Sequence, residues 1–248
     1  MPPTLAHRLE YAALRGFSGL LVPLGPRVGG RVAGAITTLG YAPFGIRRGV
    51  TMRQIAAAFP EMDRSTVARV ARESYANLGR VAIEAILLAR RGSRDVLAQF
   101  APSPSWEVVE RALALGRGIV FVSGHLGSWE LSAAYVAARG VPVHAIARGM
   151  SNPLADDFFR RTRERLGIGI VHDRDAVRRV PRALRDGMAV GVLSDQATAG
   201  LASTFVPFFG RPAKTPRGGA VFALRAEAPL LYAQAVRQPD GRDRKSVV

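Results

Sequence analysis

The chain has 248 residues, which is enough to bury a sizeable core within one domain. It contains no cysteine, which excludes disulfides, thiolate chemistry and cysteine-ligated zinc. The formal charge is +16, and because only Lys214 and Lys245 are lysines, 33 of the 35 basic residues are arginine.

A chain this basic favours anionic partners, such as nucleic acid, an acidic membrane, a phosphorylated lipid or an acidic carrier protein. Nucleic acid is not expected, because the sequence has neither basic residues interleaved with aromatic ones nor a zinc-finger spacing. We expect a membrane surface and an anionic substrate instead. The four histidines lack the close spacing of metal ligands, so we expect no metal site, and no cofactor is expected.

Residues 1–46 are predicted to form an apolar helical region that associates with a membrane. The stretch 16–44 is long enough to cross a bilayer, but it is interrupted by Pro23, Pro26, Arg27 and Arg31. We predict two apolar helical pieces in the membrane interface, or one poorly formed anchor. An ordinary buried helical hairpin is the alternative.

Residues 47–238 are predicted to form one α/β domain. A well-capped helix is expected from Asp63 to Ala89. Beyond it, helices expected at 105–115, 128–138, 153–166, 175–185 and 218–226 alternate with short apolar strands expected at 119–122, 141–147, 168–171, 188–193, 205–208 and 230–236. This alternation predicts a central, mostly parallel sheet flanked by helices. The polar residues 239–248 lack periodicity, and we expect them to be a truncated or artefactual C-terminus.

The most informative segment, residues 119–130, reads Ile-Val-Phe-Val-Ser-Gly-His-Leu-Gly-Ser-Trp-Glu. It predicts a strand, a loop that carries His125, and a helix with Glu130 in its first turn. His125 then lies at the carboxyl end of a strand, where open α/β sheets place their ligand sites. We predict that the Glu130 carboxylate holds one imidazole nitrogen and leaves the other as a general base. The alternative is a structural histidine with a glutamate that complements the helix dipole.

The His-Leu-Gly-Ser-Trp-Glu motif resembles the His-x4-Asp/Glu signature of glycerolipid-type acyltransferases. Further blocks are similar, in the same order, to the bacterial lipid A biosynthesis acyltransferases and the related phosphatidylinositol mannoside acyltransferases. These blocks are Arg47 to Glu84, Ala147 to Gly167, Ser194-Asp195-Gln196, and Phe205 to Thr215. The resemblance covers residues 45–236.

This resemblance implies an enzyme of lipid A and lipopolysaccharide biosynthesis on the cytoplasmic face of the inner membrane. It would move a fatty acyl chain from acyl carrier protein or acyl-CoA to a hydroxyl of a lipid A precursor, a related anionic glycolipid or a phospholipid. His125 and Glu130 would be its catalytic residues, and no covalent acyl-enzyme is needed.

The resemblance also suggests substrate-binding residues. Arg148 and Arg163 would face phosphates, because the guanidinium fork suits phosphate oxygens. Asn152, Asp195 and Gln196 are expected to bind substrate as well. The amides around Gly127, at the start of a helix, are candidates for an oxyanion hole. Surface charge is the alternative for each arginine, and a helix cap is the alternative for Asp195 and Gln196.

Two other functions stay open. Within the enzyme class, the chain could be a phosphatidylinositol mannoside or lysophospholipid acyltransferase. In a different class, it could be a non-catalytic basic α/β protein that binds a membrane or nucleic acid.

Overall fold

The computed structural model describes residues 2–90, 92–100, 105–197, 202–237 and 243–247. A sheet of six strands forms the centre of its α/β part. The strands lie in the order β3-β2-β4-β1-β7-β8, and all are parallel except β8, which is antiparallel to β7. Their bounds are β1 Ile119–Ser123, β2 Val143–Ala147, β3 Ile168–His172, β4 Ala189–Leu193, β7 Leu230–Arg237 and β8 Asp243–Val247. The predicted mostly parallel sheet flanked by helices is confirmed.

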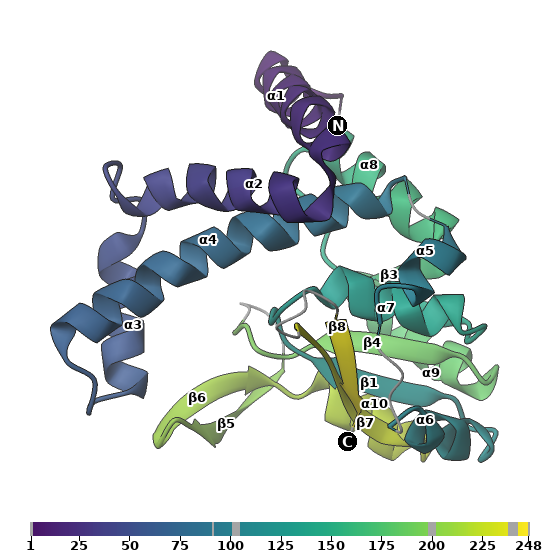
Figure 1. The fold of residues 1–248 in the computed structure, drawn as a ribbon. Helices are drawn as coiled ribbons and strands as arrows, with labels where there is room; N and C mark the ends of the chain where they lie inside the picture. The colour runs from purple at the N-terminus through teal and green to yellow at the C-terminus, as the bar shows by residue number, and fades with distance from the viewer. Residues whose placement is uncertain (1, 91, 101–104, 198–201, 238–242, 248) are drawn as a thin grey trace. The chain divides into compact units, whose positions relative to one another are not determined.

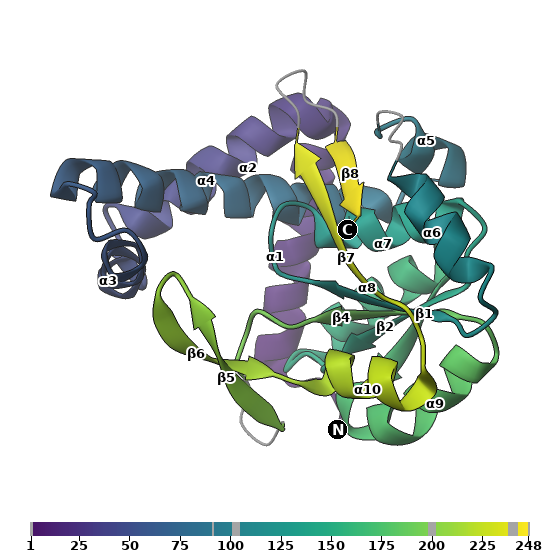
Figure 2. The same ribbon diagram turned by 90° about the horizontal axis from the view of Figure 1, so that it is seen from below.

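Helices cover both faces of this sheet (Figures 1 and 2). Alternate residues of β1 point to opposite faces, as the two-residue period of a strand requires. Ile119 and Phe121 belong to one buried cluster together with residues of α5, α6 and α7, whereas Val120 belongs to another with residues of α9 and α10. The helices around the sheet are α5 Ser93–Leu97, α6 Trp106–Leu113, α7 Trp129–Ala138, α8 Pro153–Arg165, η2 Asp173–Asp175, α9 Ala176–Arg185 and α10 Gly218–Ala226.

The strand order creates a switch point between β1 and β4. After β1 the chain runs through α7 to β2, and after β4 it runs through α10 to β7. The two connections therefore run in opposite directions along the sheet. Parallel sheets bind their ligands outside the carboxyl ends of the strands at such a point. The strand order therefore predicts a ligand site in the loops after β1 and β4.

Contacts between residues divide the chain into two compact units. The α/β unit comprises Met1–Ala12, Leu88–Phe205 and Lys214–Val248, and the helical unit comprises Ala13–Leu87 and Val206–Ala213. The predicted boundary at residue 46 lies inside the helical unit. Part of the polar tail forms β8, which pairs with β7 from Asp243 to Val247; residues 238–242 and 248 lie outside the described residues.

The part of the chain before the α/β sheet folds into helices: α1 Leu5–Leu21, η1 Val22–Leu24, α2 Gly25–Tyr41, α3 Arg48–Ala58 and α4 Arg64–Leu88. Within the helical unit, α2 packs closely on α4 through small residues. A Cβ atom on Gly34 would lie 2.8 Å from the carbonyl oxygen of Ala76, and one on Gly79 would lie 2.4 Å from that of Ala33. In the part of the chain that the structure describes, no helix is both long enough and apolar enough to cross a bilayer.

The predicted cap of α4 is confirmed. A carboxylate oxygen of Asp63 accepts a hydrogen bond of 2.8 Å from the amide of Thr66. Hydrogen bonds from the Ser65 hydroxyl and from Thr66 lower the pKa of Asp63 to about 2. The charged carboxylate therefore caps the helix throughout the neutral range.

A two-stranded hairpin, β5 Ser203–Phe208 and β6 Arg211–Pro216, follows β4 in the chain. The sequence predicts only the first of these strands. Phe209 and Gly210 both have positive φ, as a two-residue hairpin turn of type I′ requires. Phe205, Phe208 and Phe209 are all exposed, so these rings do not form a core.

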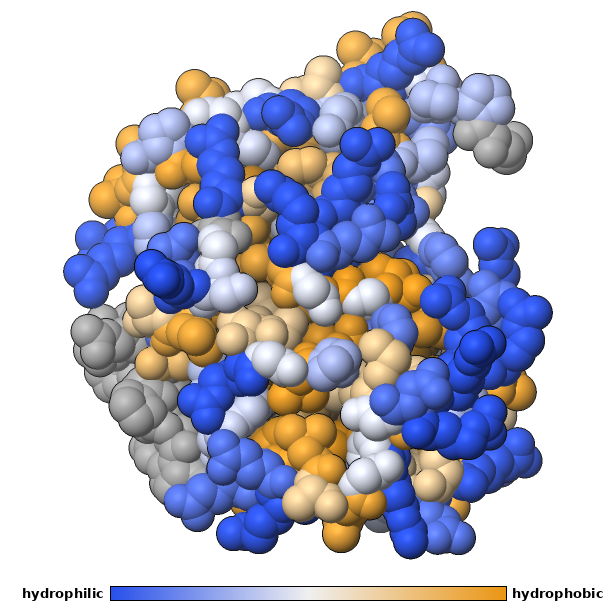
Figure 3. Space-filling view, turned by 90° about the vertical axis from the view of Figure 1, so that its right-hand side faces the viewer, coloured by the Kyte–Doolittle hydropathy of each residue, from blue (hydrophilic) through white to orange (hydrophobic). Residues whose placement is uncertain are grey.

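Figure 3 shows hydrophilic side chains in many separate groups on one face of the molecule, with hydrophobic residues between them. This distribution agrees with a sequence in which the charged residues are dispersed through the helices.

Candidate active site

His125 and Asp195 meet at the switch point between β1 and β4. The two strands pair in register with Ser123 opposite Leu193. His125 and Asp195 each lie two residues beyond these paired ends. The register of the two strands therefore places them at the same height along the strand direction. The amide of Ser194 also donates to the carbonyl of Ser123 over 2.9 Å, which continues the pairing past the ends of the strands.

Asp195 binds His125 through both carboxylate oxygens. One oxygen lies 2.8 Å from the imidazole Nδ1, and the other accepts a hydrogen bond of 2.8 Å from the backbone amide of His125. A Cβ atom on Gly124 would lie 3.3 Å from the Cβ and Cγ atoms of Asp195, so glycine at this position allows the close approach. The two-point contact fixes both the backbone and the ring of the histidine.

This geometry determines which imidazole nitrogen can act as a base. An ionised carboxylate only accepts hydrogen bonds, so the nitrogen that faces it carries the proton. With the proton on Nδ1, Nε2 has a lone pair that can accept a proton from a substrate. The side chain of His125 is about one-third exposed, at 34 %, so a substrate can reach the ring.

Glu130 does not make the contact that we expected from the sequence. Its carboxylate faces Arg163 of α8, whose Nε donates to it over 3.0 Å and whose Nη2 makes a second, short bond. Asp195 occupies the Nδ1 side of the histidine instead. The physical reason is the strand order, because β4 lies next to β1 and delivers its own carboxylate to the loop that contains His125.

The Glu130–Arg163 pair is bidentate and mostly buried, with side chains 16 % and 24 % exposed. Burial by itself lowers the pKa of the Arg163 guanidinium, but the hydrogen bond and negative charge of Glu130, together with the charge of Asp156, raise it overall. The guanidinium of Arg163 is thus held in its charged form. The pair connects the first turn of α7, directly after the His125 loop, to α8.

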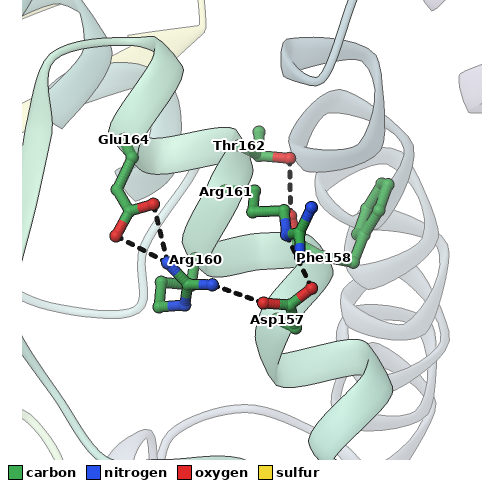
Figure 4. A network of polar contacts seen from close by, with 6 residues as sticks. All are labelled: Asp157, Phe158, Arg160, Arg161, Thr162 and Glu164. Atoms are coloured by element: carbon green, nitrogen blue, oxygen red, sulfur yellow. Dashed lines mark hydrogen bonds and ion pairs between the residues drawn. The ribbon is translucent and has the colours of Figure 1, made fainter.

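Arg160 and Arg161, on the same helix, have different partners. Figure 4 shows Arg160 between Asp157 and Glu164, while Arg161 contacts the same Asp157. These groups are more exposed than the Glu130–Arg163 pair. Within the cluster of arginines at 160, 161, 163 and 165, the family resemblance suggests that Arg163 faces a phosphate, whereas in the structure its guanidinium binds the carboxylate of Glu130.

Arg148 lies at the carboxyl edge of the sheet, in the loop after β2. Its Nε donates to Asp173 over 2.9 Å, and its side chain is 60 % exposed. The hydrogen bond from Arg148 lowers the pKa of Asp173, helped by the backbone amide of Arg174. Asp173 fixes one edge of the guanidinium, and sequence reasoning did not identify this partner.

Asn152 has a structural role as the N-cap of α8. Its side-chain oxygen accepts hydrogen bonds from the amides of Leu154 and Ala155, and its Nδ2 donates to the carbonyl of His7 and to Glu10. The side chain is buried, and both hydrogens of its amide are already used. The predicted contact with substrate is not needed to explain this residue.

Gly127 occupies a position that requires glycine. Its φ is +55°, and a Cβ atom would lie 2.6 Å from the carbonyl oxygen of Ala235 on β7. Ser128 follows at the N-cap position of α7, but its buried hydroxyl has no hydrogen-bond partner among the described residues. The first-turn amides of α7 have no preceding helical carbonyl to bind, so they are donors available to an anion. Gln196 follows Asp195 in the loop after β4.

A parallel sheet covered on both faces, with a histidine–carboxylate pair beyond its central strands, is the arrangement of an α/β enzyme. The sequence model of the bacterial lipid A biosynthesis acyltransferases matches residues 26–247, which is most of the chain. The chain therefore belongs to this family, as its motifs indicated. A search of curated proteins gives no significant match.

Proposed function

We propose that this chain transfers a fatty acyl group from a thioester to a hydroxyl of a lipid A precursor or a related glycolipid. The observation that carries the proposal is the two-point contact between His125 and Asp195 at the switch point of the sheet. Membership of the lipid A acyltransferase family supplies the reaction class. The donor is acyl carrier protein or acyl-CoA.

In the proposed reaction, Nε2 of His125 removes the proton of the acceptor hydroxyl while the oxygen attacks the thioester carbonyl carbon. The resulting tetrahedral oxyanion collapses and breaks the carbon–sulfur bond. The imidazolium returns the proton to the leaving thiolate, so no acyl-enzyme forms and the histidine is regenerated. Asp195 stabilises the imidazolium during this cycle.

The remaining site residues have supporting roles in this proposal. The first-turn amides of α7, beside Gly127, stabilise the oxyanion. The Glu130–Arg163 pair holds that turn in place, which makes both of them positioning residues. Arg148, with its exposed guanidinium, binds a phosphate of the acceptor or donor.

A matrix of donors and acceptors tests the substrate class. Acyl carrier protein and CoA thioesters with a radiolabelled acyl chain would each be offered with a lipid A precursor, a phosphatidylinositol mannoside and a lysophospholipid. We expect labelled product with the lipid A precursor. Turnover on a lysophospholipid alone would contradict the proposed acceptor, and no transfer in any combination by the folded protein would favour a non-catalytic binding protein.

We further propose that the protein works at the cytoplasmic face of the inner membrane. The support is a stripe of exposed apolar side chains on α2 at spacings of three and four residues. These side chains are 37–49 % exposed: Leu24, which is the N-cap of α2, and Val28, Val32, Ile36 and Leu39 within the helix. An apolar stripe of this kind, flanked by arginines, suits a helix that lies in the interface of an anionic bilayer.

Replacing Val28 and Val32 together by aspartate is expected to weaken binding to anionic vesicles at least about tenfold, because apolar area no longer enters the bilayer. The matched control replaces Val177 and Leu224 by aspartate, since these exposed residues lie on α9 and α10 of the α/β unit. Vesicle co-sedimentation measures both variants. Equal losses in the two would mean that added negative charge, and not the α2 stripe, determines binding.

A further inference from the structure

A groove of about 620 Å³ lies between α2 and α4, wholly inside the helical unit. One face of each helix lines it, because the lining residues recur at spacings of three and four along both. Four of the lining residues are arginines, Arg31 on α2 and Arg69, Arg72 and Arg80 on α4, and Glu73 is the acidic one. Nothing in the proposed acyl transfer uses this groove.

The positive charge of the groove is mostly uncompensated. Arg69 pairs with Glu73 at 3.2 Å on the surface of α4. Arg31, Arg72 and Arg80 form no ion pair with any residue that the structure describes. Three unpaired guanidinium groups along one groove repel each other and attract an anion. Because each group presents a fork of donors, phosphate oxygens are the acceptors that match it best.

The stem of Arg80 is already positioned for such a contact. Its Cγ atom lies close to Gly30 of α2, where a Cβ atom would be only 3.6 Å away. The aliphatic part of the side chain thus packs on the neighbouring helix while the charged end stays exposed. This packing reduces the entropy that a bound phosphate would have to remove.

The groove also has an apolar part, formed by residues of α2 that include Ala35 and Leu39. Leu39 belongs at the same time to the exposed apolar stripe of α2. A ligand that fills the groove next to this stripe needs a negative head and an apolar tail. We infer that the groove between α2 and α4 binds the phosphate of an anionic phospholipid, with the acyl chains of that lipid along the stripe.

The test compares the 248-residue chain with a variant of it in which Arg72 and Arg80 are both replaced by glutamine. The control replaces Arg53 and Arg64 by glutamine, which removes the same charge from exposed positions of the same unit that do not line the groove. The probe is a short-chain phosphatidylglycerol below the concentration at which it aggregates, with binding measured by calorimetry. We expect the affinity for the phospholipid to fall roughly a hundredfold in the groove variant, because two charge-assisted contacts are lost. In the control variant the affinity should fall by less than about threefold.

A second variant leaves every arginine in place. Replacing the exposed Ala35 by glutamate keeps a good helix former but puts a negative charge into the groove, and it should also abolish binding. Circular dichroism checks that each variant is folded. Equal affinities of the groove variant and the control variant would overturn the inference.

Two further binding measurements identify the molecule that carries the phosphate. Inorganic phosphate at the same concentration should compete weakly, because it lacks the acyl chains; binding as tight as that of the phospholipid would overturn the lipid assignment. A groove variant that still binds the phospholipid but no longer binds acyl carrier protein would likewise overturn it, in favour of protein docking. Because binding is measured without acyl transfer, failure here is distinguishable from failure of the proposed activity.

Discussion

Replacing Asp195 by asparagine is expected to lower kcat by about 10²–10⁴-fold while the protein stays folded. The carboxylate holds the Nδ1–H tautomer of His125, and a neutral amide can also donate a hydrogen bond and so stabilise the wrong tautomer. His125→Ala should cause a loss of the same size. Because the two residues act as one unit, the double variant should be no slower than His125→Ala alone.

Steady-state kinetics on a verified substrate measures these variants. Asp186→Asn is the matched control, since Asp186 is an exposed aspartate just before β4, at the opposite end of that strand from Asp195. It should retain near-normal turnover. Losses that multiply in the double variant, or an Asp195→Asn protein with normal kcat, would show that Asp195 does not work through His125.

Replacing Arg163 by methionine is expected to destabilise the α/β unit by about 2–4 kcal/mol, because it leaves the carboxylate of Glu130 mostly buried without its partner. Glu130→Gln should lower the free energy of unfolding of this unit by a similar amount. The double variant should recover part of the loss, because it leaves neither charge buried alone. Turnover should fall in both single variants, since the turn after His125 is no longer held.

Urea unfolding followed by tryptophan fluorescence measures this effect. Both tryptophans of the chain, Trp106 and Trp129, lie in the α/β unit, so the signal reports on the unit that contains the pair. Arg161→Met is the control on the same helix, because Arg161 makes an exposed pair with Asp157, and it should cost less than about 1 kcal/mol. If Arg163→Met and Arg161→Met lowered the free energy of unfolding equally, the Glu130–Arg163 pair would not stabilise the turn after His125.

These two experiments also separate two roles for Glu130. The sequence predicts that Glu130 orients His125, whereas the structure has it facing Arg163. If Glu130 positions the turn, its replacement should couple energetically to Arg163. If it acts on the histidine, its replacement should couple to His125 instead.

Much of the α/β unit could be predicted from sequence because the signals are local. The run from Ile119 to Val122 and the glycine break after Ser123 predict a strand followed by a loop, and the structure has β1 there. The proline at the start of α8 likewise acts within a few residues of its position, as does the cap at Asp63 in the helical unit. The position of His125 beyond the end of a strand follows from these signals.

Other features have weak local signals and were missed. The polar segment Asp243–Val247 has no hydrophobic alternation, yet it pairs with β7 as the edge strand of the sheet. The strand β6 contains two prolines and a lysine, and its pairing with β5 depends on the turn at Phe209 and Gly210. Backbone pairing stabilises both segments, and a sequence pattern based on side chains does not report it.

The sequence by itself determined the alternation of helices and strands, the family, and the place of His125 at the carboxyl end of a strand. Only the tertiary structure decided which carboxylate meets that histidine. Asp195 is 70 residues away in the chain, and it reaches His125 because β4 pairs with β1 in register. Glu130 is five residues away and faces Arg163 instead. Side-chain periodicity reports local geometry, whereas strand order results from burying both faces of the whole sheet, so the pairing of charged groups across it cannot be read from local patterns.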